Sequence, residues 1–214
     1  MNFFGHAVVA LWHGDDARFL LGAMLPDLCG MLGIRATRPQ DSEIAQLSAG
    51  IEFHHSTDAA FHGCDRFVAL CSQTVEALTA RGVARGTSRA AGHVGTELLL
   101  DGLLSQQRHA RARYGQALAL AVDERLSERV LSEPEQQARL HAGLKRLQRA
   151  PIPEAYSDPS FVADRLQWIL SSRPRLAMQP QDAPAVQQEL TRLAAGVSAH
   201  AAEILDQVRA RLAL

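Results

Sequence analysis

Between residues 186 and 208, apolar side chains recur every three or four residues, which is the spacing of one face of an α-helix. The apolar positions are Val186, Leu190, Leu193, Val197, Ala201, Ile204 and Val208. The whole chain is rich in Ala, Leu, Arg, Gln and Glu, contains only 5% aromatic residues, and shows no alternation of β-branched with polar residues. These features predict an all-α fold, a helical bundle that includes a long amphipathic helix near the C-terminus.

Two further helices are indicated by residues that favour helix starts. Ser132 followed by Glu135 predicts a capping box ahead of EQQARLHAGLKRLQR. Asp158 followed by Pro159 predicts an N-cap and a first-turn proline ahead of FVADRLQWIL. No stretch between the predicted helices is long or biased enough to be a flexible linker. We therefore expect one domain over residues 1–214, with the chemistry-bearing helices mainly in 1–110 and arginine-bearing helices in 132–214.

Composition narrows the classes of function. The three cysteines, Cys29, Cys64 and Cys71, are odd in number and lack the paired CxxC spacing of zinc modules, so we expect reduced thiols and a cytoplasmic protein. The formal net charge of −1 gives no bulk electrostatic reason to expect nucleic acid or an anionic membrane as a partner. There is no run of eighteen apolar residues, so we expect no membrane span.

The stretch GIEFHHSTDAAFH carries the strongest signal of chemistry. His54, Asp58 and His62 follow one another at intervals of four, so on a helix they form a stripe that rises by about 6 Å per step. Neighbours in such a stripe can bind one ion, but three ligands spread over about 12 Å cannot. Two arrangements stay open: one ion on His54 and Asp58 with His62 outside, or a pair of ions bridged near Asp58.

A second stripe with the same spacing follows in AAGHVGTELLLDG. It consists of His93, Glu97 and Asp101, and the leucines around it predict a largely buried helix. A buried carboxylate without a cation or a hydrogen-bond donor is costly, which favours a metal ion nearby. Gly92 and Gly95 flank the histidine and suggest close approach by another backbone or by a ligand. Histidine and carboxylate ligands without cysteine suit Mn, Fe, Zn or Mg.

Four segments together carry a family resemblance. MNFFGH at the start, GAMLPD at 22–27, GIEFHHSTDAAFH at 50–62 and TELLLDGLL at 96–104 resemble, in order and approximate spacing, the bacterial acyl carrier protein phosphodiesterase family. The corresponding family motifs are MNFLAH, GNLLPDF, GIxxHRxIDxFTD and LDxxxDHxL. The resemblance implies an HD-domain-like helical hydrolase that uses a divalent metal, typically manganese, to release 4′-phosphopantetheine from holo acyl carrier protein.

The resemblance also assigns residues, position by position. Its metal and catalytic positions fall on His6, Asp27, His54, Asp58, Glu97 and Asp101. Three positions depart from the family. His55 stands in place of arginine, His62 in place of an aspartate, and Gly102 in place of the histidine of DHxL. His93 is not part of the family pattern, and we expect it to replace the function lost at Gly102, with His62 retained as a ligand.

Further roles follow from ordinary side-chain chemistry. Asp58 is the ligand on which water activation depends, and His55 and His62 are the candidate general acids for the leaving oxygen. Tyr156, Arg173 and Arg175 are candidates for binding the phosphate or the protein partner.

The sequence leaves three functions open. The first is a metal-dependent phosphodiesterase that acts on acyl carrier protein or on a smaller phosphate ester. The second is a non-catalytic helical binding or scaffold protein that keeps the fold and a structural ion. The third is a di-iron oxygenase of the HD type.

Overall fold

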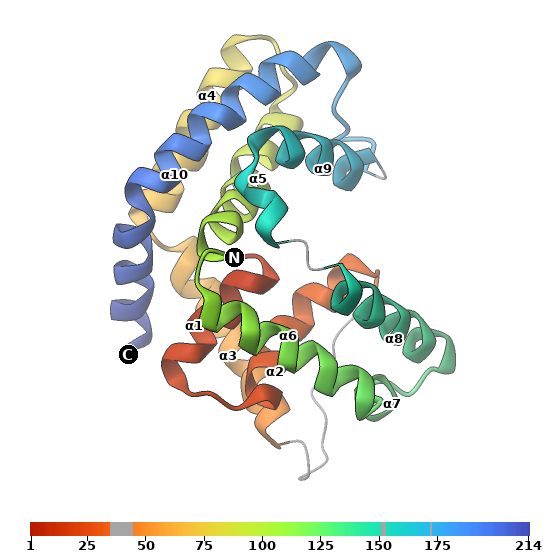
Figure 1. The fold of residues 1–214 in the computed structure, drawn as a ribbon. Coiled ribbons are helices and arrows are strands. Elements are labelled where there is room, and N and C mark those ends of the chain that lie inside the picture. The colour runs from red at the N-terminus through yellow and green to blue at the C-terminus, as the bar shows by residue number, and fades with distance from the viewer. Residues whose placement is uncertain (35–44, 151–152, 172) are drawn as a thin grey trace. The chain divides into compact units, whose positions relative to one another are not determined.

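The computed structural model describes residues 1–34, 45–150, 153–171 and 173–214. The predicted all-α class is confirmed: the described residues form helices and contain no strand (Figure 1). The α-helices are α1 Phe3–His13, α2 Ala17–Met31, α3 Ala45–His62, α4 Asp65–Ala80, α5 Arg85–Leu104, α6 Arg108–Asp123, α7 Leu126–Val130, α8 Pro134–Arg149, α9 Pro159–Ser171 and α10 Ala183–Leu212. Two 3₁₀ helices are η2 Pro153–Ser157 and η3 Pro180–Asp182.

The chain divides into two compact units, and it passes between them within α3, near the end of α5 and before η2. The first unit comprises Met1–Ala59, Leu104–Ile152 and Leu214. The second comprises Ala60–Leu103 and Pro153–Ala213. The expectation of a single domain stays a prediction.

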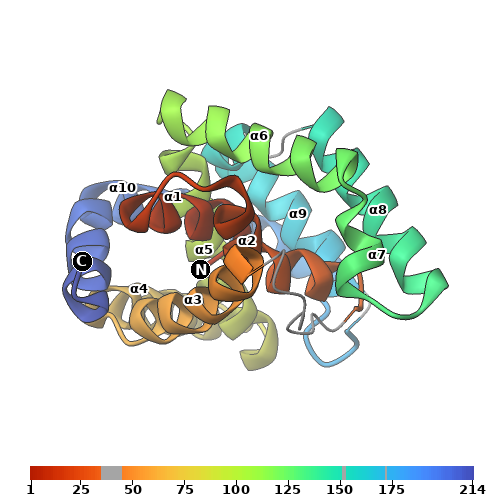
Figure 2. The same ribbon diagram turned by 90° about the horizontal axis from the view of Figure 1, so that it is seen from below.

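In the first unit, α2 and α3 cross with their backbones in contact. A Cβ on Gly22 would lie 2.2 Å from the Leu47 carbonyl oxygen, and a Cβ on Gly50 would lie 2.2 Å from the Phe19 carbonyl oxygen. Glycine is therefore required at both positions for this approach. Asp16 starts α2, since its side chain accepts hydrogen bonds from the amides of residues 18 and 19. Helix α6 packs against α1, α2 and α8 in the same unit (Figure 2).

In the second unit, α10 runs alongside α4 and also packs against α9 (Figure 1). The predicted amphipathic helix is confirmed, because every apolar residue named for its inner face is buried: Val186, Leu190, Leu193, Val197, Ala201, Ile204 and Val208. The close approach expected at Gly92 is also present, with Cys71 of α4 as the neighbour: a Cβ on Gly92 would lie 3.0 Å from its carbonyl oxygen. At Gly95 the neighbours are leucine side chains instead of backbone.

The two predicted helix starts had different outcomes. The Asp158 cap is confirmed, since its side chain accepts a hydrogen bond from the Ser160 amide at 2.8 Å and α9 begins at Pro159. The capping box at Ser132 was wrong. Helix α8 begins at Pro134, with Glu133 at the N-cap and no side-chain capping bond. Proline at the first helical position has no amide to satisfy, so it can start the helix without the box.

Within the described part of the chain, no helix combines the length and the apolar character that crossing a bilayer requires.

Candidate metal sites

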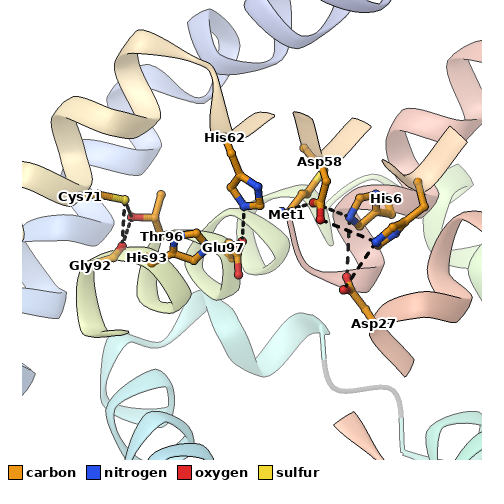
Figure 3. A network of polar contacts seen from close by, with 11 residues as sticks. Met1, His6, Asp27, Asp58, His62, Cys71, Gly92, His93, Thr96 and Glu97 are labelled. Atoms are coloured by element: carbon orange, nitrogen blue, oxygen red, sulfur yellow. Dashed lines mark hydrogen bonds and ion pairs between the residues drawn. The ribbon is translucent and has the colours of Figure 1, made fainter. Parts of the chain in front are cut away.

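Four side chains from three helices meet in the first unit (Figure 3). His6 belongs to α1, Asp27 to α2, and His54 and Asp58 to α3. Donor atoms of His6, His54 and Asp58 all lie within 4.8 Å of one another, so this group could hold a metal ion. The Asp27 carboxylate lies near both imidazoles. We call these four residues the first site.

The spacing of the donor atoms in the first site suits one small cation. His6 Nε2 lies 3.2 Å from Asp58 Oδ1 and 3.6 Å from Asp27 Oδ2. His54 Nε2 lies 3.7 Å from Asp58 Oδ2 and 3.9 Å from Asp27 Oδ1. Donors held at about 2.0–2.2 Å from a tetrahedral ion are about 3.3–3.6 Å apart. The side chains therefore fit a divalent ion with only small shifts.

The protonation state of His54 is fixed by the neighbouring helix. Its Nδ1 is 2.9 Å from the backbone carbonyl oxygen of Ala23. A carbonyl oxygen can only accept a hydrogen bond, so Nδ1 carries the proton and Nε2 keeps its lone pair. Burial lowers the pKa of His54, which keeps the ring neutral. A backbone carbonyl behind a neutral imidazole is the usual way in which proteins orient a histidine ligand.

His6 lacks this arrangement. It is fully buried, and burial lowers its pKa to about 4. Its Nε2 contacts Asp58, while its Nδ1 has no hydrogen-bond partner among the described residues. The two rings stack with centroids 4.0 Å apart, which places both Nε2 atoms on the same side, toward the carboxylates. His54 is thus the oriented ligand, and His6 must shift its proton to Nδ1 to bind an ion.

The Asp58 carboxylate is ionised, and both carboxylates of the first site are reachable from solvent. Burial alone would raise the pKa of Asp58, but the hydrogen bond with His6 and the charge of the Met1 amino group, 3.0 Å away, hold it well below its usual value. The side chains of Asp27 and Asp58 are 29% and 32% exposed, whereas both histidine rings are buried. A ligand can therefore approach from the carboxylate side.

A second group of possible ligands lies in the second unit. His62 at the end of α3 and His93 on α5 each place Nε2 at 3.1 Å from Glu97 Oε1 (Figure 3). The two imidazole centroids are 4.8 Å apart. We call His62, His93 and Glu97 the second site, and their donor atoms also lie close enough for one ion. His62 therefore groups with the second stripe and not with His54 and Asp58.

The acidic residue of the second site is almost buried, yet it is ionised. Burial alone would raise the pKa of Glu97, but the hydrogen bonds with His62 and His93 hold it well below its usual value. The imidazoles remain more open, with side-chain exposures of 35% and 48% against 14% for Glu97. The site thus combines a buried negative charge with two accessible nitrogen donors.

Three sequence candidates belong to neither site. Asp101 is fully buried and belongs to neither ligand group, although its charge acts on Tyr156. Tyr156 is 1% exposed, and burial raises the pKa of its phenol, so it packs in the interior of the second unit and offers no open binding surface. His55 is exposed, and its ring meets His54 edge-on, with centroids 5.3 Å apart.

The two arginine candidates, Arg173 and Arg175, lie in different surroundings. Arg173 lines an open pocket of about 770 Å³ in the second unit, together with Arg85, Arg89 and His93. Arg175 is exposed but does not line this pocket. Its backbone carbonyl instead packs against α5, where a Cβ on Gly86 would lie 2.6 Å from it.

Gly102 has a structural reason to be glycine. A Cβ there would lie 2.2 Å from the carbonyl carbon of Tyr156 and 2.3 Å from the Ser157 amide nitrogen. The backbone of η2 thus occupies the space that a side chain at 102 would need. Glycine at this position thus allows the close packing of η2 on α5.

Sequence reasoning missed four contributors. The Ala23 carbonyl carries no side-chain signal and could not have been found. Arg85 and Arg89 could have been found from the sequence, because they extend the stripe of His93 and Glu97 toward the N-terminus at the same interval of four. The contact of the Met1 amino group with Asp58 depends on tertiary structure alone.

Comparisons of the chain with protein-family models, curated proteins and solved structures returned no match. Function is therefore inferred from the chemistry of the sites.

Proposed function

We propose that the protein is a metal-dependent phosphohydrolase whose catalytic centre is the first site. The observation that carries this proposal is the convergence of His6, Asp27, His54 and Asp58, which come from three separate sequence segments. A buried histidine pair facing two accessible carboxylates suits a divalent ion with room for a further ligand. Bound there, such an ion supplies Lewis-acid chemistry, polarising phosphoryl oxygens and activating water.

The residues of the chain have distinct tasks in this proposal. Asp27 and Asp58 supply negative charge on the solvent side, and His54 supplies a preorientated nitrogen donor. His55 is the candidate proton donor for the leaving oxygen, because it is exposed and contacts the His54 ring. His62, the other general-acid candidate, is engaged by Glu97 in the second site, which favours His55 for this role.

The specific substrate that we propose is holo acyl carrier protein, with release of 4′-phosphopantetheine and with manganese as the ion. Support comes from the resemblance to the phosphodiesterase family, whose motifs place four of their metal positions on the residues of the first site. We also propose, from the same resemblance, that the helices have an HD-domain-like arrangement. The departures at His55 and Gly102 make a smaller phosphate ester the alternative substrate.

The test is release of phosphopantetheine from holo acyl carrier protein, followed by mass spectrometry. With manganese, the wild type should convert holo to apo carrier protein, and Asp58→Asn should lower the rate at least 100-fold because a charged ligand is lost. Asp123→Asn removes the same charge from an exposed position at the end of α6 and should leave the rate unchanged. If the wild type is inert on carrier protein but hydrolyses bis-p-nitrophenyl phosphate, the smaller ester is favoured. If it is inert on both while binding manganese, the non-catalytic alternative is the better account.

A further inference from the structure

We propose that the second site binds a transition-metal ion of its own, and that this ion and the neighbouring arginines together hold a phosphate-bearing ligand in the pocket of the second unit. This inference does not depend on the function proposed for the first site. It rests on the second site, the pocket beside it and the distribution of charge around that pocket.

The ligand set of the second site is two imidazoles and one carboxylate. Both Nε2 atoms lie 3.1 Å from the same oxygen, Glu97 Oε1, so the donors already converge. Three protein ligands of these types leave at least one coordination position free, as in catalytic zinc sites. Nitrogen donors favour Zn²⁺ over Mg²⁺. The half-exposed imidazoles leave the free position accessible to a ligand from solvent.

Aromatic packing restricts the two imidazoles. The Phe67 ring lies 5.4 Å from the His62 ring and 5.3 Å from the His93 ring, measured between centroids. Phe61 packs against both Phe67 and His62. A buried phenylalanine pair behind the donors limits their motion and excludes water from that side. The second site is thus supported in the way that a ligand-binding constellation requires.

The pocket begins at His93 and extends along α5 toward its N-terminus. Arg85, Arg89, His93 and Glu97 are spaced by four residues, so they share one face of the helix, with about 6 Å between neighbours. His93, Arg89 and Arg85 all line the pocket. A ligand in the pocket can therefore contact a metal ion at one end and guanidinium groups one and two turns away.

Arg173 approaches the same pocket from the segment after α9. This segment is fixed on the start of α5 by two contacts. The Arg175 carbonyl packs closely on Gly86, and the Thr87 hydroxyl donates a hydrogen bond to the Ala177 carbonyl at 3.4 Å. The pocket thus has arginines on two sides.

The residues that line the pocket carry an excess of positive charge. Its lining holds three arginines against one acidic residue, Glu76. Among the ion pairs between described residues, none involves Arg85, Arg89 or Arg173. Arg85 and Arg89 are one turn apart on α5, where like charges destabilise a helix. A phosphate would relieve this repulsion and would accept the paired hydrogen bonds that guanidinium groups offer.

The metal arm of the test uses the full chain with the first site disabled by His54→Ala and Asp58→Ala. This double variant should still bind one Zn²⁺ per chain in isothermal titration calorimetry. Adding Glu97→Gln should weaken that binding at least 100-fold, because the only charged ligand is lost. The matched control is His200→Ala, which should leave zinc affinity unchanged. His200 also pairs with a glutamate, Glu203 at 3.3 Å, but this pair has no third possible ligand in the described chain.

Equal zinc affinity with and without Glu97→Gln would overturn the metal site, as would the absence of zinc binding in a folded double variant. If the double variant does not fold, the same comparison is made in the wild type. There, Glu97→Gln should lower the number of bound Zn²⁺ ions by one, and an unchanged number would overturn the site.

The ligand arm uses inorganic phosphate as the probe. Phosphate should bind the zinc-loaded protein and should bind at least tenfold more weakly after Glu97→Gln. The double change Arg85→Gln with Arg89→Gln should also weaken phosphate at least tenfold while leaving zinc affinity unchanged. Arg209→Gln with Arg211→Gln, at the exposed end of α10, removes the same charge and should have no effect. Phosphate affinity that is insensitive to Arg85 and Arg89, or to zinc, would overturn the proposed pocket ligand.

Discussion

The imidazole of His54 on α3 donates a hydrogen bond from Nδ1 to the backbone carbonyl of Ala23 on α2, over 2.9 Å. This bond turns Nε2 toward Asp27 and Asp58, at 3.9 and 3.7 Å. The bond requires α2 and α3 to pack against each other. The same two helices contact each other at Gly22, directly before Ala23, and at Gly50, one turn before His54.

The first prediction concerns this helix crossing. Gly22→Ala and Gly50→Ala should each destabilise the protein by about 1–3 kcal/mol or more, because each methyl group meets backbone that cannot move independently. Gly30→Ala, in the same α2 helix with open space around it, should be neutral or stabilising by up to about 1 kcal/mol. Urea denaturation measures all three. Equal stability of the Gly22 and Gly30 variants would contradict the close crossing of α2 and α3.

The second prediction separates the role of His55 from that of the metal ligands. If His55 protonates the leaving oxygen, His55→Ala should lower kcat about 10²-fold or more for a diester with an alkyl leaving group. It should change kcat little for bis-p-nitrophenyl phosphate, whose leaving group departs without a proton. His54→Ala should impair both substrates. Equal loss on both substrates in His55→Ala would exclude the general-acid role.

The third prediction concerns Gly102. Introducing the histidine of the DHxL motif with Gly102→His should destabilise the protein and should not raise activity, since the η2 backbone fills the space beside this position. Gly102→Ala should already cost about 1–3 kcal/mol. Gly115→Ala on α6 is the control, because nothing lies within 4 Å of the added methyl group. A stable and more active Gly102→His variant would show that the position belongs to the catalytic centre.

The fourth prediction concerns the pKa of the Cys71 thiol. Burial raises the pKa of Cys71 from 9.0 to about 11, and its Sγ donates to the Gly92 carbonyl. At pH 8 its alkylation in the folded protein should be about 100-fold slower than in guanidinium, because the thiolate reacts. As the pH rises, the Cys71 thiol loses its proton at a lower pH in the unfolded chain than in the folded protein. The thiol therefore stabilises the folded state below pH 9, and this stabilisation is lost as the pH rises toward 11. Peptide mapping after timed alkylation gives the rate, and equal rates in both states would refute the shift.

Local patterns in the sequence predicted local structure well. The burial of α10 follows from periodicity, and the start of α9 follows from Asp158 and Pro159, because both signals act within one or two turns. The capping box at Ser132 failed because Pro134 supplied a competing start one residue before Glu135. Boundaries are sensitive to such competition between neighbouring signals.

Spacing along a helix predicted ligands but not their grouping. Intervals of four identified His54 with Asp58, and His93 with Glu97, as neighbours. They could not show that His62 joins the second pair, since that depends on contacts between helices. Asp101 fits the stripe equally well, yet it is buried and belongs to neither group of possible ligands. Contacts between helices depend on tertiary packing, which residue spacing in a single sequence does not encode.

We propose above all that His6, Asp27, His54 and Asp58 hold one divalent ion. The most direct measurement is an anomalous-difference map from crystals grown with manganese, recorded on both sides of the manganese absorption edge. We predict a peak within bonding distance of the two Nε2 atoms and of one oxygen from each carboxylate, and its loss in Asp58→Asn crystals. A map with no peak among these four side chains at saturating manganese would contradict the claim.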